Sequence, residues 1–319
     1  MNPNPRRIDV HHHVLPPAFM ADLRRQGIAW TGGPVLFDWN IPIALEMMER
    51  QGIGTAMASV VPSVHWGDIK SAIHFAKLSN DYLAEIVQKD PAHFGGLGTL
   101  PLPDVAESLK ETRRIYDELK MDGLILFSSQ ANTYLGDPAY EELYQELDRR
   151  KAVVLIHPTT APPGATVPKI TVPWGIVEFV ADTSRAVANL LYNGVLERYP
   201  DIRFIVSHAG GFVPYIALRM SLSGDHIPGM KDNIPKGTLH YLKKLYYDTT
   251  LSTSEQVLAA LGQFVPKGQV LFGSDYPLVP EEVVKLERSM LETSKVLDDA
   301  TRKAIDRDNA LALFPRFAK

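Results

Sequence analysis

The sequence predicts an α/β protein, and within that class a (β/α)8 TIM barrel with inserted loops after strands 1 and 5. Short β-branched or apolar runs alternate with longer segments of helical periodicity, and this alternation recurs eight times. Such alternation favours a parallel sheet, and 319 residues accommodate eight strand–helix units in a single domain covering residues 1–319. An open doubly wound sheet is the alternative arrangement.

The expected strands are short runs that end close to polar residues. In chain order they are Ile8–His13, Thr55–Val61, Phe94–Leu100, Gly123–Phe127, Ala152–His157, Arg203–His208, Leu245–Thr250 and Gln269–Gly273.

The expected helices begin at capping residues and end near prolines or polar residues. They are Asp68–Gln88, Asp104–Leu119, Pro138–Arg150, Ile176–Arg198, Ser254–Leu261, Glu281–Glu292 and Asp299–Leu313. Asp104 and Asp137 are the expected N-caps, and Pro138 occupies a first helical position.

Two irregular stretches are the expected inserted loops. Gly27–Ile41 is rich in glycine and aromatic residues, and Thr159–Pro173 is rich in proline. Both follow strands, where barrel enzymes place their substrate contacts.

Composition excludes several classes of protein. The net charge of −4 gives no support to a nucleic-acid surface, and the absence of cysteine excludes thiol catalysis and thiolate metal sites. No apolar run reaches the length of about 18 residues that a membrane span needs. The N-terminal residues lack the apolar segment of a secretory signal, so a cytoplasmic location is expected.

Five residues that can ligate a metal fall at the carboxyl ends of the expected strands. His11 and His13 share one side of strand 1, because side chains alternate along a strand. His157 and His208 end strands 5 and 6, and Asp275 follows strand 8. A barrel brings all these strand ends to one mouth, where its active site lies.

Each of these residues also has a structural interpretation. A single histidine at a strand end can simply be hydrogen-bonded, and Asp275 can cap a turn. The joint pattern instead indicates metal binding. Nitrogen and oxygen ligands without sulfur suit Zn²⁺ or another divalent first-row ion.

The motifs IDVHHH, VLIHP, VSHAGG and LFGSDYP, in this order, resemble the amidohydrolase superfamily. The resemblance extends over essentially the whole chain. It is strongest to the branch of aminocarboxymuconate-semialdehyde decarboxylase and related benzoate-type decarboxylases, with the 6-methylsalicylate decarboxylases nearest.

The resemblance implies a role for each matching residue. His11, His13, His157 and Asp275 match the metal ligands, and His208 matches an acid/base beside the metal. Trp174 and Arg219 match substrate-side positions, and that arginine reaches the neighbouring subunit's site, which implies a homodimer.

Two departures from the family pattern refine these expectations. Some decarboxylases of this branch open with Glu-x-His; His-x-His here favours zinc over manganese. The aminocarboxymuconate enzyme carries an arginine in its first loop, whereas Gly27–Ile41 holds neither lysine nor arginine, which disfavours the aminocarboxymuconate substrate.

Further candidates for the substrate pocket are His65, which follows strand 2, and the aromatic residues Trp30, Phe37 and Trp39.

The expected function is metal-dependent, non-oxidative decarboxylation of an aromatic or conjugated carboxylate. In this interpretation His208 delivers a proton or activates water, and Asp275 shares in the proton transfer. The alternative is hydrolysis of a lactone, amide or enol ester by the same site. A metal-binding protein without catalysis is disfavoured, because His208 would be superfluous beside four ligands.

Overall fold

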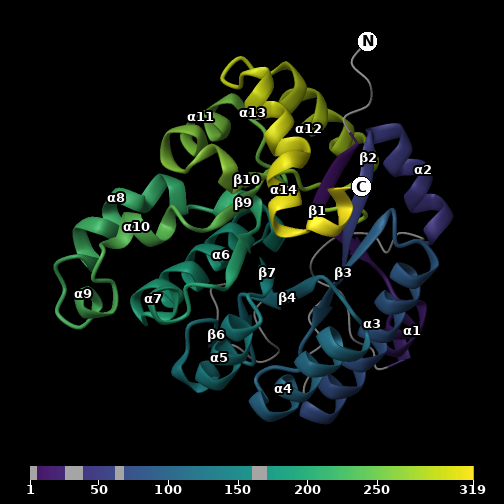
Figure 1. Ribbon diagram of the computed structural model, residues 1–319, viewed down its shortest axis with the longest axis horizontal. Helices are drawn as coiled ribbons and strands as arrows, with labels where there is room; N and C mark the ends of the chain where they lie inside the picture. Colours follow the sequence, from purple (N-terminus) through teal and green to yellow (C-terminus); the bar gives the residue numbers. More distant parts are fainter. Residues whose placement is uncertain (1–5, 26–38, 62–67, 160–170, 319) are drawn as a thin grey trace.

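Eight parallel strands form the centre of the molecule (Figure 1). The computed structural model describes residues 6–25, 39–61, 68–159 and 171–318. The strands pair in the order β1 (Arg7–Val14), β2 (Ile53–Val60), β3 (Phe94–Thr99), β4 (Gly123–Phe127), β7 (Val153–His157), β8 (Arg203–Val206), β9 (Tyr246–Asp248) and β10 (Val270–Leu271). Each overlaps one of the expected strands, which confirms the barrel.

The segment after β10 closes the barrel against β1. Val10 N donates to Phe272 O at 3.0 Å, Asp275 N to His11 O at 2.8 Å and His13 N to Tyr276 O at 2.7 Å. Barrel closure therefore places the residues around Asp275 directly beside the histidine-bearing end of β1.

Side-chain alternation divides the core into two layers. Ile125 and Phe127 of β4, and Val153 and Leu155 of β7, belong to the cluster inside the barrel. Leu124 and Val154 belong to the larger cluster between the strands and the helices. The inner cluster also includes Phe314 and Phe317 near the C-terminus, so the chain end covers the amino-terminal end of the barrel.

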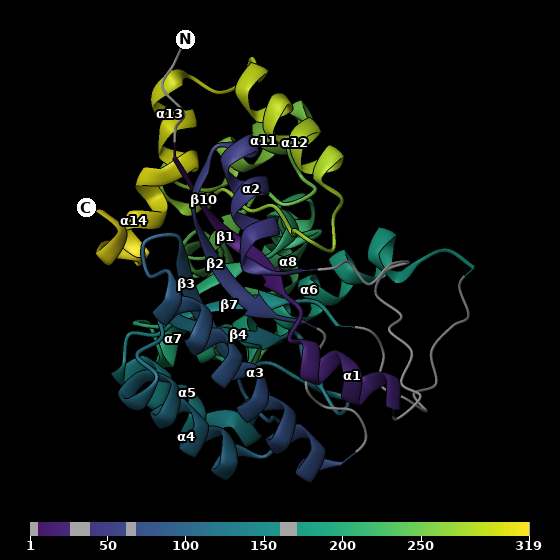
Figure 2. The ribbon, with the colours of Figure 1, turned by 90° about the vertical axis from the view of Figure 1, so that its right-hand side faces the viewer.

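Helices surround the strands (Figures 1 and 2). They are α1 (Pro17–Arg25), α2 (Ile41–Gln51), α3 (Ile69–Lys89), α4 (Val105–Arg113), α5 (Glu141–Arg149), α6 (Trp174–Tyr192), α7 (Val195–Arg198), α8 (Val213–Gly224), α9 (Met230–Asn233), α10 (Thr238–Leu242), α11 (Glu255–Phe264), α12 (Glu281–Thr293), α13 (Asp299–Lys303) and α14 (Asn309–Leu313). In Figure 2, α14 and α1 lie on opposite sides of the strands.

The expected helix starts are confirmed at two caps. Asp104 accepts from Glu107 N, and Asp137 accepts from Ala139 N ahead of a short 3-10 turn and α5. The expected helix Ile176–Arg198 is wrong as a single element. It breaks between α6 and α7 at Gly194, whose φ of 74° lies in the left-handed region that glycine favours.

Several elements were not expected from the sequence. They include α1, α2, α9, α10 and a small antiparallel hairpin of β5 (Ser129–Gln130) and β6 (Thr133–Tyr134). In the part of the chain that the structure describes, no helix is both long and apolar enough to cross a bilayer.

Candidate metal centre

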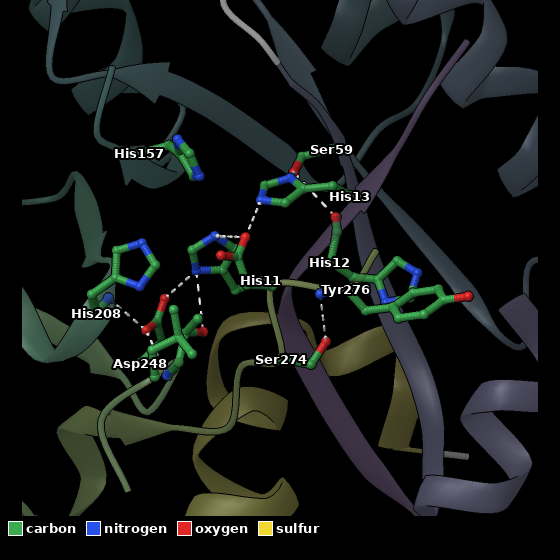
Figure 3. Close-up of polar contacts among 12 residues, drawn as sticks. His11, His12, His13, Ser59, His157, His208, Asp248, Ser274 and Tyr276 are labelled. Carbon is green, nitrogen blue, oxygen red and sulfur yellow. Dashed lines mark hydrogen bonds and ion pairs between the residues drawn. The ribbon is translucent and has the colours of Figure 1, made fainter. Parts of the chain in front are cut away.

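A β-bulge in β1 aims His11 and His13 into the barrel. Asp9 pairs with Ala56 and His12 with Ala58, so β1 advances three residues where β2 advances two. Ile8 and Val10 consequently face the interior before the bulge, and His11 and His13 face it afterwards. His12 points the other way, toward the ring of Tyr276 (Figure 3).

The remaining site residues come from strand ends and from the turns after them. His157 is the last residue of β7, as expected. The expectation that His208 ends its strand is wrong: β8 stops at Val206, and His208 begins a 3-10 turn with φ of 53°. β10 stops at Leu271, earlier than expected, and Asp275 lies in the following turn with φ of 59°.

Four buried residues from these segments converge on one point. His11, His13, His157 and Asp275 each present a ligand atom, and these atoms all lie within 4.8 Å of one another. Asp275 Oδ1 is 3.0 Å from His13 Nε2 and 3.4 Å from His11 Nε2. Figure 3 shows the rings of the three histidines turned toward this point, with His208 beside them.

Hydrogen bonds behind His13 and His157 fix which ring nitrogen carries the proton. His157 Nδ1 lies 2.7 Å from the carbonyl oxygen of Pro158, which only accepts. His13 Nδ1 lies 2.9 Å from Ser59 Oγ, whose own hydroxyl donates to His12 O. Both Nδ1 atoms are therefore donors, and both Nε2 atoms carry lone pairs directed at the cluster.

The third histidine has a charged partner. His11 Nδ1 lies 2.7 Å from Asp248 Oδ2, so it too acts as a donor. The Nε2 atoms of His11, His13 and His157 and Asp275 Oδ1 are buried without a hydrogen-bond partner. Converging buried acceptors of this kind need a positive charge between them, and nitrogen and oxygen donors fit a divalent cation.

The pKa values of the cluster residues reflect the same need for a positive charge. Burial lowers the pKa of His13 to about 4 and that of His157 well below its usual range. Burial also acts on His11, but the carboxylates of Asp248 and Asp275 outweigh it and raise the pKa of His11 to about 10. Burial likewise opposes ionisation of Asp275, yet His11 and His13 hold its pKa well below the usual range. The carboxylates of Asp248 and Asp275 therefore favour a positive charge in the cluster. A proton on His11 supplies this charge, and a metal ion that takes the place of that proton would supply it too.

His208 lies beside the four-residue cluster and does not join it. Its ring centroid is 5.2 Å from that of His11 and 6.2 Å from that of His157. Burial lowers the pKa of His208, and its Nδ1 is buried without a hydrogen-bond partner. A neutral imidazole at this position is available to take up and deliver a proton.

The residues expected near the substrate differ in how far they are buried. Trp174 is the first residue of α6 and is half-buried, whereas Arg219 is exposed on α8. Trp39 is buried in the core, with its ring centroid 6.3 Å from that of Tyr82 and 6.4 Å from that of Phe94. Its contacts are those of a core residue, and its substrate-binding role stays a prediction. His65, Trp30 and Phe37 lie outside the described residues.

Two buried aspartates support the site and were missed in the sequence. Asp9 Oδ1 accepts from His11 N at 3.1 Å and Ser274 N at 3.0 Å, so it joins β1 to the turn that carries Asp275. Asp248 ends β9 and contacts His11. Two features of the sequence could have indicated them. Asp9 lies inside the histidine motif IDVHHH, and Asp248 lies near the end of an expected strand.

Comparisons with known proteins agree with this geometry. Residues 8–316 match the family model described as amidohydrolase. A 6-methylsalicylic acid decarboxylase of Penicillium expansum is 32% identical over 316 residues, which cover 97% of this chain and 96% of that protein.

Solved structures share the same architecture. A crystal structure described as amidohydrolase II superposes with a TM-score of 0.90 at 26% identity, covering 97% of this chain and 99% of the other. The 5-carboxyvanillate decarboxylase of Novosphingobium aromaticivorans, solved with manganese and 4-hydroxy-3-methoxy-5-nitrobenzoic acid, gives a TM-score of 0.86 at 23% identity, covering 97% and 96%.

Proposed function

Because this chain belongs to the amidohydrolase family, we propose that it is a metal-dependent, non-oxidative decarboxylase of a small aromatic carboxylate of the hydroxybenzoate type. The observation that carries the proposal is the convergence of buried imidazole nitrogens and a carboxylate oxygen at the barrel mouth. The activity of the Penicillium relative supports the reaction class.

The four cluster residues are the proposed ligands of the metal. His11, His13 and His157 offer Nε2, and Asp275 offers a carboxylate oxygen. When bound, a divalent cation supplies positive charge that holds and polarises substrate oxygens. We favour zinc, because three imidazoles and one carboxylate suit it, although manganese was bound to the related 5-carboxyvanillate decarboxylase.

His208 is the proposed acid/base. The ring carbon that loses CO₂ must gain a proton, and His208 is the buried imidazole beside the cluster. Because its pKa is lowered by burial, its imidazole is neutral near pH 7. The proton that it delivers therefore has to be acquired from the substrate hydroxyl or from solvent in each turnover. Asp275 faces the same space and shares in this transfer.

The reaction is tested with two substrate sets. We expect salicylate-type acids to release CO₂ and the corresponding arene in equal amounts, and simple lactones to remain closed. CO₂ and ring-opened acid are recorded separately, with the chelator-treated protein as the control. Lactone opening without CO₂ from any acid would contradict the proposal and favour a hydrolase.

We further propose that the protein is a homodimer. Phe212, the N-cap of α8, is followed along the helix by Tyr215, Leu218 and Leu222, and these residues are 41% to 92% exposed. An apolar stripe of this kind is typical of a surface that another protein covers. Arg219 lies on the same helix and has no ion-pair partner among the residues that the structure describes. A second copy seated on this stripe would receive the arginine near its own site, where it would bind the substrate carboxylate.

Arg219→Ala is expected to lower kcat/KM for carboxylate substrates by about 10- to 100-fold, the effect of losing one charged hydrogen bond, while metal content is unchanged. Arg113→Ala, which removes another exposed arginine, is the control. Co-expression of the Arg219→Ala and His208→Ala chains tests the subunit crossing, because a mixed dimer regains one complete site. No regain of activity, or a fully active monomer, would contradict the shared site.

We infer that residues 1–319 form one barrel domain, since the family match extends over residues 8–316. The cytoplasmic location stays a prediction.

A further inference from the structure

Asp248 is a buried carboxylate that belongs neither to the proposed ligands nor to the proposed acid/base. It ends β9 and is completely buried. Oδ2 lies 2.7 Å from His11 Nδ1, while Oδ1 accepts from His208 N at 2.8 Å and from Thr250 N at 3.1 Å. Figure 3 shows it between His11 and His208.

We propose that Asp248 is a positioning residue that sets the tautomer of His11 and the backbone of His208 at the same time. This inference rests on the proposed metal site. One carboxylate thereby couples the ability to hold the metal with the placement of the proton-transferring imidazole.

His11 receives its tautomer from Asp248. An ionised carboxylate has no hydrogen to give, so the close contact with Oδ2 requires His11 Nδ1 to be the donor. The lone pair needed for a ligand then resides on Nε2, which faces His13, His157 and Asp275. His13 and His157 obtain the same tautomer from uncharged partners, Ser59 and the carbonyl of Pro158. The Thr250 hydroxyl also lies 3.3 Å from His11 Nδ1, but the carboxylate of Asp248, at 2.7 Å, is the nearer and the charged partner.

The turn that carries His208 uses Asp248 as a backbone acceptor. His208 and Ala209 both have positive φ, 53° and 54°, a conformation that non-glycine residues adopt only when their surroundings impose it. The bond from His208 N to Asp248 Oδ1 ties the start of this turn to the adjacent strand. Thr250 N donates to the same oxygen, so Asp248 Oδ1 accepts from two backbone N–H groups.

These contacts make Asp248→Asn a sharp test, because an amide cannot satisfy both sides. If the amide oxygen faces His208 N and Thr250 N, the amide nitrogen donates to His11 Nδ1. His11 then carries its proton on Nε2 and loses the ligand lone pair. If the amide is reversed, its nitrogen faces two backbone N–H groups, and the His208 turn loses its acceptor.

The measurement is zinc affinity of the metal-free protein by titration calorimetry, with thermal unfolding recorded alongside. We expect Asp248→Asn to weaken zinc binding by about 10- to 100-fold, as is usual when a partner of a ligating histidine is lost. At saturating zinc, kcat is expected to remain below that of the wild type, because the His208 turn is still altered. Asp248→Glu, which keeps an acceptor-only group, is expected to recover part of the zinc affinity.

Asp306→Asn is the matched control. Asp306 is also a buried carboxylate, but it binds Arg7 at the opposite end of β1. Its loss is expected to lower thermal stability and to leave zinc affinity unchanged. Equal zinc affinity in Asp248→Asn and the wild type would overturn the inference. Failure of the wild type itself to bind zinc or another divalent ion would instead overturn the proposed metal site.

A measurement on the unsubstituted protein covers the case in which Asp248→Asn fails to fold. Nitrogen-edited NMR of histidine-labelled, zinc-loaded protein distinguishes Nδ1–H from Nε2–H imidazoles. A charged acceptor shortens the hydrogen bond and moves the Nδ1–H proton downfield, so the inference requires the Nδ1–H signal of His11 to lie downfield of those of His13 and His157. A His11 signal no further downfield than theirs would overturn it, whereas failure of the protein to load zinc would overturn the metal site instead.

Discussion

The His208→Ala variant is expected to retain its metal while kcat falls by about 10²- to 10⁴-fold, the usual contribution of a general acid or base. Its ring lies beside the cluster, at 5.2 Å from the ring of His11, but is not among the four residues whose ligand atoms converge. Removing it therefore removes proton transfer and leaves the metal donors in place. Metal content by elemental analysis and kcat with a salicylate-type acid are the two measurements.

His93→Ala provides the control for loss of a histidine elsewhere. His93 is half-exposed and paired with Asp90 in the turn before β3, away from the cluster. It is expected to keep both metal and turnover. If His208→Ala lost the metal together with activity, His208 would be a ligand, and near-normal turnover would remove it from the mechanism.

The Asp275→Ala variant is expected to lose both metal and activity. Asp275 supplies the carboxylate among the four converging donors, and its buried charge attracts a cation to neighbouring imidazoles. A ligand contributes directly to the metal, so the fall in affinity should exceed the roughly 100-fold upper range found for outer partners of ligands. His13→Ala is expected to act in the same direction. Elemental analysis after gel filtration and activity after chelation and zinc addition check both variants.

Zinc addition separates an emptied site from a damaged fold. The chelator-treated wild type is expected to regain activity on addition of the metal, whereas Asp275→Ala is not. The control is again Asp306→Asn, whose buried carboxylate binds Arg7 at the start of β1, the end opposite the cluster. Turnover that persists in fully chelated wild-type protein would contradict metal dependence.

Most strands and helices of the fold could be predicted from local sequence patterns. Apolar runs such as Gly123–Phe127 predicted strands, because burial of alternating side chains on both faces of a barrel strand leaves a clear apolar signal. The residues Asp104 and Asp137 predicted helix starts, because an N-cap bonds backbone groups only two or three positions away. Short elements such as α9, which has no buried residue, left no comparable signal.

The four proposed ligands could be predicted from the sequence, because a parallel barrel brings the carboxyl ends of all its strands to one mouth, whereas Asp9 and Asp248 could not. The directions in which these side chains point follow from contacts between segments that are distant in the sequence. The bulge in β1 that turns His11 and His13 inward depends on pairing with β2, whose partner residues lie about 46 positions further along the chain. The His208 turn and its bond to Asp248 join residues 40 apart. Contacts between such distant residues leave no periodic pattern in either segment, so only the folded barrel reveals them.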